Sequence, residues 1–296
     1  LLRAVGDTKR PLYFLLCAGV INVVLNLIFV VGFHLDVMGV AIATVISETV
    51  SALLVLRCLM KESGGIHLEL CALHIHRKKM IQILRIGLPA GFQGVVFALS
   101  NVVIQSSVNI FGNIVVAGNS AAANLEGFVY MAMNAFYQTT LSFVSQNYGA
   151  GEQKRIHRIV LLGEACVIVT GTLLGNAVVF FGNELLHIYS SNPEVIAAGI
   201  VRLHYISMVY ALCGIMDVMV GALRGIGYSV MPMIVSIVGV CVLRLVWLAT
   251  GFPIPEYHRI ETVYLSYPVT WILTSLVYIV FFIWVRVRTC RKSAAA

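Results

Sequence analysis

Charged side chains are scarce in this sequence. Asp, Glu, Lys and Arg together make up 11% of the 296 residues, while apolar residues make up 59%. The mean hydropathy is +0.93. Soluble domains carry about a quarter charged residues, so this composition excludes an ordinary soluble domain and indicates a protein that crosses the membrane several times.

The sequence also lacks the signatures of a metal centre, a disulfide framework or a nucleotide-driven machine. Its seven cysteines form no CxxC pair, and most of them fall inside apolar segments. Cys71, His74 and His76 have a spacing found in metal ligands but no second cluster accompanies them, so we predict no metal site. The sequence contains no Walker loop, GxGxxG motif or Ser-His-Asp spacing, and we expect neither an ATPase nor a cofactor.

Eight apolar segments are each long enough to cross a bilayer, which takes roughly 20 helical residues. Short polar connections separate them, as expected between helices rather than between soluble domains. The sequence therefore predicts an all-α polytopic membrane protein with eight transmembrane helices. The segments cover approximately residues 11–33, 38–58, 84–111, 116–146, 157–181, 195–221, 230–250 and 264–285.

Lysine and arginine gather in every second connection between these segments. The other connections carry a single basic residue, Arg259, beside several acidic ones. Because excess positive charge marks the cytoplasmic side, we predict that both ends of the chain are cytoplasmic, in a cell membrane that we expect to be a bacterial inner membrane. The net charge of +7 then reflects topology and contact with membrane lipids, and we expect no nucleic-acid binding. The basic residues of the connections predicted to be cytoplasmic are Arg3, Lys9, Arg10, Arg57, Lys61, Arg77, Lys78, Lys79, Arg85, Lys154, Arg155, Arg158, Arg224, Arg286, Arg288, Arg291 and Lys292.

A ten-residue stretch occurs twice, at residues 2–11 and 223–232. Aligned without gaps, the two copies share Leu, Arg, Gly and Pro at positions one, two, five and ten, and an apolar segment follows each copy. The glycine suits a tight exit from one helix, and the proline suits the first turn of the next. Arg3 and Arg224 are expected to contact helix carbonyls or lipid phosphates. Such a duplication indicates two homologous halves.

The repeat also predicts how the chain is divided. Four apolar segments precede the second copy within its half, whereas none precedes the first copy. We therefore expect twelve helices in two six-helix lobes that form a parallel repeat, with this chain an N-terminally truncated fragment. Residues 1–60 would hold the last two helices of the N-terminal lobe and residues 61–83 a cytoplasmic linker. Residues 84–296 would form the six-helix C-terminal lobe and a cytoplasmic tail, and the sequence Ile-Gly-Leu-Pro at 86–89 would begin its first helix.

Five motifs follow one another along the chain. They are residues 2–11 followed by Asn22, Leu25 and Asn26, then 39–44 (GVAIAT), 86–89 (IGLP), 145–151 (SQNYGAG) and 223–232. In this order they resemble the MATE (multidrug and toxic compound extrusion) family of transporters along essentially the whole chain. The resemblance implies a two-lobe transporter with a central cleft, which exports organic cations and other amphipathic compounds in exchange for Na⁺ or H⁺. It implies an antiporter rather than an enzyme, and we expect it to be monomeric.

Glu126 is the strongest candidate for a functional group inside the membrane, where ionisable side chains are costly and usually face a cavity or a partner. Four polar or aromatic residues follow it at helical spacing and share its face. We predict that Glu126 binds a cation and that the four residues line a substrate cavity, where cation–π contacts suit a planar cation. The alternative is a ladder of hydrogen bonds that only packs helices. The four residues are Tyr130, Asn134, Tyr137 and Gln138.

Asn101 and Gln105 lie one helical turn apart on the preceding segment. They are predicted to face the same cavity or, alternatively, to join neighbouring helices by hydrogen bonds. Asp217 lies six positions before Leu223. MATE transporters commonly carry an acidic residue in this helix that takes part in cation coupling, so the resemblance implies such a role for Asp217. Its expected place near the cytoplasmic end also fits an ordinary solvated carboxylate.

Two arginines, Arg202 and Arg244, fall inside apolar segments. Unpaired charges there would be expensive, so each arginine is expected to have a partner, with Glu126 and Asp217 as candidates. We predict structural roles for Arg202, Arg244 and the mid-segment Glu48.

The sequence thus predicts a secondary-active multidrug efflux transporter that works by alternating access. One alternative is a lipid-linked oligosaccharide flippase of the same superfamily, which would need a strongly cationic cavity for a pyrophosphate group. Another is a membrane-embedded lipid-modifying enzyme, which would need clustered Asp and His at the membrane surface. The eight histidines of this chain are dispersed along the sequence, which argues against the enzyme.

Overall fold

The protein is built of helices that fall into two compact units. The computed structural model describes residues 1–62 and 65–294, with side chains through residue 288, and every regular element in that part is helical. Unit 1 comprises Leu1–Arg77 and unit 2 comprises Lys78–Ala296. Residues 63 and 64 of the predicted linker lie outside the described residues, as do the side chains of Arg291 and Lys292.

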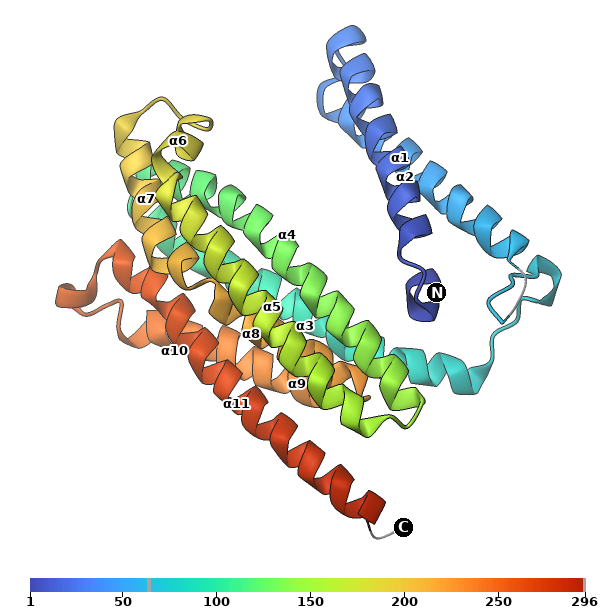
Figure 1. Ribbon diagram of the computed structural model, residues 1–296. Helices are drawn as coiled ribbons and strands as arrows, with labels where there is room; N and C mark the ends of the chain where they lie inside the picture. Colours follow the sequence, from blue (N-terminus) through green and yellow to red (C-terminus); the bar gives the residue numbers. More distant parts are fainter. Residues whose placement is uncertain (63–64, 295–296) are drawn as a thin grey trace. The chain divides into compact units, whose positions relative to one another are not determined.

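Unit 1 is a hairpin of two long apolar helices, α1 and α2, which Figure 1 draws in blue. A side-chain hydrogen bond joins them, from Asn22 Nδ2 to Ser47 Oγ at 3.2 Å. Polar contacts of this kind join helices within membranes, where the hydrophobic effect between helices is missing. The elements are η1 (Leu2–Val5), α1 (Lys9–Asn26), the π-helical turn η2 (Leu27–Gly32), α2 (Asp36–Lys61) and η3 (Leu70–Ala72).

Arg10 connects the start of α1 with the residue that follows α2, because its guanidinium pairs with both Asp7 and Glu62. Partial desolvation raises the pKa of Asp7, but the hydrogen bonds from Arg10 outweigh it and hold this pKa below its usual value.

The two copies of the repeated stretch have the same backbone conformation. Gly6 and Gly227 both occupy the left-handed region, at φ 88° and 91°. In each copy the glycine N–H donates to the carbonyl of the arginine at position two, and the next N–H donates to the leucine carbonyl at position one. This pattern is a Schellman helix ending, which requires a residue that tolerates positive φ. The prediction that the glycine provides a tight helix exit is therefore confirmed in both copies.

Unit 2 is a bundle of long helices connected by short turns (Figure 1). Its long helices are α3 (Arg77–Asn109), α4 (Asn113–Gly149), α5 (Gln153–Phe180) and α11 (Ile260–Ala294). Its shorter elements are α6 (Gly182–His187), α7 (Pro193–Ile206), η4 (Ser207–Val209), α8 (Ala211–Gly225), α9 (Val230–Ser236), the π-helical turn η5 (Ile237–Val242), α10 (Leu243–Thr250) and η6 (Pro255–Tyr257).

Helix α4 is central to unit 2, because it packs against α5, α7 and α8. A Cβ atom on Gly118 of α4 would lie 2.5 Å from the carbonyl oxygen of Val195 in α7, so a glycine is needed for this approach. Further along α4, Met133 is fully buried in a cluster with Val167 of α5 and Val218 of α8. Close backbone approach and side-chain packing therefore hold these four helices together.

The chain is a multi-pass membrane protein. Six helical segments in the described part are long and apolar enough to span a membrane, and the pair Pro193–Val209 and Ala211–Gly225, bent by 46°, would make a seventh. Helix α4 is not among them, although it is 37 residues long. Its Asn, Ser and Gln side chains and Glu126 lower its hydropathy, so the predicted number of eight crossings is not confirmed. The six are Lys9–Gly32, Asp36–Lys61, Arg77–Asn109, Gln153–Phe180, Val230–Thr250 and Ile260–Arg288.

The predicted start of the third segment is wrong. Helix α3 begins at Arg77, and Pro89 lies inside it rather than in its first turn. The preceding residues 77–85 are mostly Lys, Arg, Met, Gln, Ile and Leu, which favour a helix or tolerate one well. These residues therefore extend the helix before the apolar segment begins.

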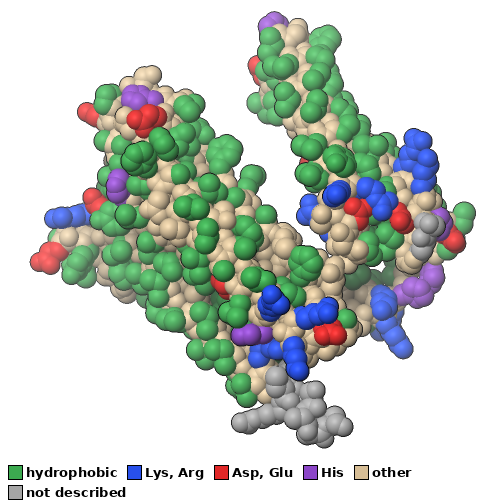
Figure 2. Space-filling model, viewed as in Figure 1, with side chains coloured by type: hydrophobic (Ala, Val, Ile, Leu, Met, Phe, Trp, Pro, Cys, Tyr) green, Lys and Arg blue, Asp and Glu red, His purple; other side chains and the backbone are tan. Residues whose placement is uncertain are grey.

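The surface of unit 2 fits a membrane environment (Figure 2). Hydrophobic side chains cover much of its visible flank, while basic side chains gather near the turn between α4 and α5. Lys154, Arg155 and Arg158 are exposed at that turn. A polar end beside an apolar flank is the distribution expected of a helix bundle in a bilayer.

The close approach of α4 and α7 makes a testable prediction. Gly118→Ala forces a backbone shift, and we expect it to lower the free energy of unfolding by about 1–3 kcal/mol. Gly127→Ala on the same helix meets no atom within 4 Å. It should be neutral or stabilise the protein by up to about 1 kcal/mol, because alanine favours a helix. Thermal unfolding of the purified protein in detergent measures both variants, and equal melting shifts would contradict the packing account.

Candidate functional site

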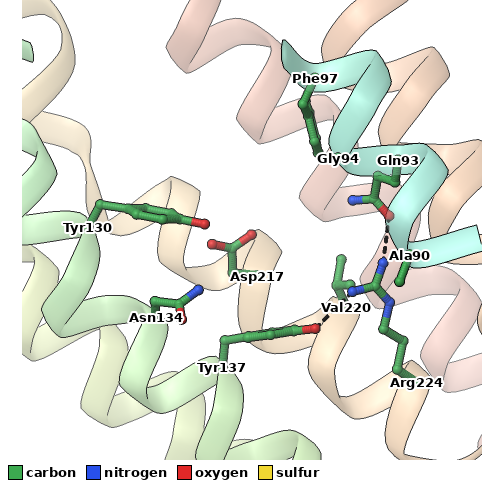
Figure 3. Close-up of a pocket in the computed structure, with 10 residues that line it drawn as sticks. All are labelled: Ala90, Gln93, Gly94, Phe97, Tyr130, Asn134, Tyr137, Asp217, Val220 and Arg224. Carbon is green, nitrogen blue, oxygen red and sulfur yellow. Dashed lines mark hydrogen bonds between the residues drawn. The ribbon is translucent and has the colours of Figure 1, made fainter. Parts of the chain in front are cut away.

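A cavity of about 170 Å³ lies between α3, α4 and α8, and we refer to it as the Arg224 cavity. Figure 3 shows polar groups from all three helices pointing into it. Its lining residues are Ala90, Gln93, Gly94, Phe97, Tyr130, Asn134, Tyr137, Asp217, Val220 and Arg224.

Arg224 connects the three helices across this cavity. Its Nη1 donates to the Tyr137 hydroxyl and its Nη2 to Gln93 Oε1, both at 2.8 Å (Figure 3). Gln93 Nε2 donates in turn to Ser236 Oγ of α9 at 2.9 Å. The expected contact of Arg224 with helix carbonyls is therefore replaced by contacts with these side chains, and its contact with lipid phosphates stays a prediction. The end of α8 carries this side chain between α3 and α4, where neutral acceptors are available.

Asp217 faces the same cavity from α8. Its Oδ2 atom is buried and accepts no hydrogen bond from any residue in the described part of the chain. The Tyr130 hydroxyl points toward the carboxylate and Asn134 lies beside it (Figure 3). A buried carboxylate oxygen without a donor is costly, so this site favours an incoming cation or proton.

A second cavity, of about 350 Å³, lies between α3, α4, α7 and α11, and we refer to it as the Arg202 cavity. Tyr130 lines both cavities. The lining residues of the second cavity are Asn101, Ile104, Gln105, Val108, Asn119, Ala123, Glu126, Gly127, Tyr130, Arg202, Ile206, Tyr210, Tyr267 and Trp271.

Glu126 and Arg202 form a buried, bidentate ion pair at the wall of the Arg202 cavity. Arg202 Nε donates to Glu126 Oε1 at 3.0 Å and Nη2 donates to Oε2 at 2.7 Å. Nη1 donates to Asn119 Oδ1 at 2.6 Å. Glu126 is 4% exposed and Arg202 is 8% exposed, so neither charge would be solvated without the other. The predicted pairing of Arg202 with Glu126 is thus present in the structure.

Hydrogen bonds extend from this ion pair into α3. Asn119 Nδ2 donates to Gln105 Oε1 at 3.1 Å, and Gln105 Nε2 donates to Asn109 Oδ1 at 3.0 Å. The Tyr264 hydroxyl donates to Asn119 Oδ1 at 3.3 Å. The pair and its amides therefore connect α3, α4, α7 and α11.

Arg244 does not pair with Asp217, the candidate that the sequence left open. Its guanidinium lies 3.9 Å from the ring centroid of Tyr267, and its Nη2 donates to Thr270 Oγ1 at 2.9 Å. No carboxylate within the described residues lies within ion-pair distance of it. Stacking on an aromatic face is a common environment for a weakly hydrated guanidinium.

The structure distributes the other predicted cavity residues between the two cavities. Asn101 and Gln105 line the Arg202 cavity, while Asn134 and Tyr137 line the Arg224 cavity. Gln138 is exposed and is not among the residues that line either cavity.

Glu48 lies in unit 1, at a groove of about 810 Å³ between α1 and α2. Asn22, Thr44 and Ser47 also line this groove. The predicted structural role of Glu48 stays a prediction.

Sequence reasoning missed several residues at these sites, notably Gln93, Asn119, Tyr267 and Trp271. Asn119 lies seven residues before Glu126, which places both on one helix face, and this spacing was a usable signal. Tyr267 and Trp271 are four apart in an apolar segment, a pattern that ordinary packing produces equally well.

Polar cavities that hold ionisable groups between membrane-spanning helices are typical of proteins that move small molecules or ions across a membrane. A family model described as MatE matches residues 89–249, just over half of the chain. The chain belongs to the MATE family, as its motifs predicted.

Two related proteins can be aligned with most of this chain. The probable multidrug resistance protein YpnP of Bacillus subtilis is 30% identical over 247 residues, which are 82% of this chain and 54% of that protein. The FAD transporter of Shewanella oneidensis is 25% identical over 284 residues, which are 93% of this chain and 61% of that protein. The chain thus spans 54% and 61% of the lengths of these two relatives. The family is one of transporters, and the prediction that the protein is not an enzyme is confirmed.

Solved structures share the fold. A MATE transporter from Vibrio cholerae matches with a TM-score of 0.83 at 21% identity, over 99% of this chain and 64% of that one. A MOP superfamily transporter from Pyrococcus furiosus matches with a TM-score of 0.87 at 18% identity, over 97% of this chain and 64% of that one. The all-helical fold of the chain is therefore that of MATE transporters.

The ion pair makes a prediction about stability. Arg202→Gln leaves Glu126 buried without its partner, and we expect the free energy of unfolding to fall by about 3–5 kcal/mol. The double variant Glu126→Gln/Arg202→Gln leaves no charge unpaired and should recover most of that loss. Denaturant unfolding of the purified protein in detergent measures both variants.

Arg155→Gln is the matched control, because Arg155 pairs with Glu152 at 3.9 Å on the exposed surface. Its effect should stay below about 1 kcal/mol. If the double variant is as unstable as Arg202→Gln, the pairing of these two charges is not what stabilises the site.

Proposed function

We propose that this protein exports small amphipathic or cationic compounds in exchange for Na⁺ or H⁺, by alternating access. The observation that carries the proposal is the buried, unpartnered Oδ2 of Asp217 at a cavity inside a bundle of the MATE family. Because the described neighbours leave this oxygen without a donor, a coupling ion or proton is the group that would complete it.

Asp217 is the coupling residue in this proposal. Tyr130 lines both cavities, so a change at the Asp217 carboxylate reaches the wall of the Arg202 cavity through one side chain. Occupation of Asp217 by Na⁺ or H⁺ removes its attraction for a cationic substrate. Substrate release then follows from charge neutralisation, with the rocking of the lobes changing the side of access.

Glu126 differs from Asp217 because its carboxylate already has a partner. Both of its carboxylate oxygens accept hydrogen bonds from Arg202. A cation can bind Glu126 only when this pair opens, so we propose that Glu126 contributes to coupling through its pairing with Arg202. Asn101, Gln105, Tyr130, Asn134 and Tyr137 stay the proposed substrate-cavity residues, with Arg202, Arg244 and Glu48 as structural charges. Gln138, which lines neither cavity, is not retained.

Relatives support export as the activity and differ in substrate. Their names include a probable multidrug resistance protein and an FAD transporter. A flippase for lipid-linked oligosaccharides is less well supported, because Glu126 neutralises one of the two intramembrane arginines that line or border the Arg202 cavity. No additional cofactor is proposed.

We also propose eight crossings, with α4 and the bent pair α7–α8 counted as one each. In this layout unit 1 holds the last two helices of one six-helix lobe and unit 2 holds the other lobe, joined by a cytoplasmic linker between the end of α2 at Lys61 and the start of α3 at Arg77. Both ends of the chain face the cytoplasm, and the protein works as a monomer surrounded by lipid in a bacterial inner membrane.

Transport by everted membrane vesicles tests the function. In vesicles from cells that express the gene, an imposed Na⁺ or H⁺ gradient should drive transport of ethidium, a cationic dye. Asp217→Asn should reduce gradient-driven transport at least about tenfold, because an amide neither binds Na⁺ strongly nor releases a proton. Dye binding in the absence of a gradient should change less than transport does. Glu126→Gln should also lower transport, with the amount of protein in the membrane measured alongside.

Glu184→Gln removes an exposed carboxylate from α6 and serves as the matched control, with transport expected to stay unchanged. Normal gradient-driven transport by Asp217→Asn would exclude it as the coupling residue. An absence of transport under both gradients by the unmodified protein would overturn the function itself.

A further inference from the structure

The charges around the Arg202 cavity do not balance. Arg202 is neutralised by Glu126, its bidentate partner at the cavity wall. Arg244 is 3% exposed and has only Thr270 as a hydrogen-bond partner within the described chain, and its Nε is buried without an acceptor. Asp217 and Arg224, which line the neighbouring Arg224 cavity, carry opposite charges, so the two guanidinium groups and one carboxylate here leave an excess of one positive charge.

Tyr267 lies between Arg244 and the cavity. Its ring forms part of the cavity wall and lies 3.9 Å from the guanidinium carbon of Arg244 and 5.7 Å from that of Arg202. The two cations thus approach the same aromatic side chain. Because the surroundings are poorly solvated, the field of Arg244 is weakly screened at the cavity.

The hydrogen-bonding groups of the cavity wall also favour a negatively charged ligand. Its strongest acceptors are already used within the protein: both Glu126 oxygens and Asn119 Oδ1 accept from Arg202, and Gln105 Oε1 accepts from Asn119. In contrast, side-chain N–H or O–H groups of four wall residues make no hydrogen bond within the described residues and are not fully buried. These four are Asn101, Tyr210, Tyr267 and Trp271.

We infer that the Arg202 cavity binds the anionic group of an aromatic substrate, such as a carboxylate or a phosphate. Spare donors and one excess positive charge suit an anion, whereas the carboxylate of Glu126 and the amide oxygens of Asn119 and Gln105, which would bind an organic cation, are already engaged within the protein. Tyr210, Tyr267 and Trp271 supply flat apolar surfaces for the rest of the ligand. The substrate class that fits both cavities is an aromatic zwitterion, whose anionic group would lie in the Arg202 cavity and whose positive group would face Asp217 in the neighbouring Arg224 cavity.

This inference rests on the proposed function, since it assigns the chemical class of substrate to a cavity proposed to hold one. Binding of two matched probes separates the two proposals. 1-Pyrenecarboxylate carries a negative charge and 1-pyrenemethylammonium a positive one, on the same ring system. Energy transfer from tryptophan to pyrene reports binding to the purified protein in lipid nanodiscs, because Trp271 lies in the cavity wall. Displacement by excess 2-naphthoate identifies the saturable part of the signal.

The unmodified protein should bind the anionic probe at least about tenfold more tightly than the cationic one. Arg244→Gln should weaken anion binding about tenfold and leave cation binding unchanged or stronger. Arg244→Lys, which keeps the charge, should stay within about threefold of the unmodified protein. Arg288→Gln is the matched control, because Arg288 is exposed and also lies over an aromatic ring, that of Trp284 at 5.2 Å.

Equal or tighter binding of the cationic probe overturns the inference and leaves the proposed export of cations standing. Saturable binding of neither probe overturns the inference together with the assignment of this cavity to substrate. Anion binding that survives Arg244→Gln unchanged overturns the role of the excess charge. If Arg244→Gln does not fold, the probe preference of the unmodified protein and of Arg244→Lys decides the question.

Discussion

The bidentate pairing of Glu126 with Arg202 is the interaction on which the organisation of unit 2 depends. A charge inside a membrane usually pairs with another group, since the cost of leaving it unpaired amounts to several kcal/mol. Arg202 comes from α7 and Glu126 from α4, so these helices must meet at that level. Gly118 lets their backbones approach closely, and Asn119 extends the polar contacts to α3 and α11. Packing and electrostatics thus impose the same helix arrangement.

The pairing also explains why the two cavities differ. In its cavity Arg202 engages the Glu126 carboxylate and Asn119 Oδ1, whereas Asp217 retains a carboxylate oxygen without a donor in the Arg224 cavity. Arg224 lines the same cavity as Asp217, yet it donates its hydrogen bonds to the neutral Tyr137 and Gln93. One cavity therefore favours negative groups and the other positive ones, with Tyr130 between them.

Much of this fold could be predicted from the sequence, because its strongest signals are local. Apolar length indicates membrane helices, and the Gly at position five of the repeat predicts the Schellman ending found at Gly6 and Gly227. Pro89 was misplaced because an amphipathic stretch before it continues the helix. The site was harder to predict, since spacing shows which residues share a face but not which helix that face meets. Glu126 and Tyr130 were found that way, whereas Gln93 joins the site only through contacts with α8 and α9.

The position of Arg244 shows why counting charges in a sequence is not enough to infer a substrate. Two arginines and two acidic residues, Glu126 and Asp217, suggest two neutral pairs and a cavity without net charge. In the folded chain only Arg202 is paired, and Arg244 lies against Tyr267 instead. A stable fold tolerates this arrangement because the aromatic face and Thr270 replace part of the lost hydration. The remaining positive charge borders a cavity whose wall has spare donors, so a bound anion would stabilise the same arginine that recognises it.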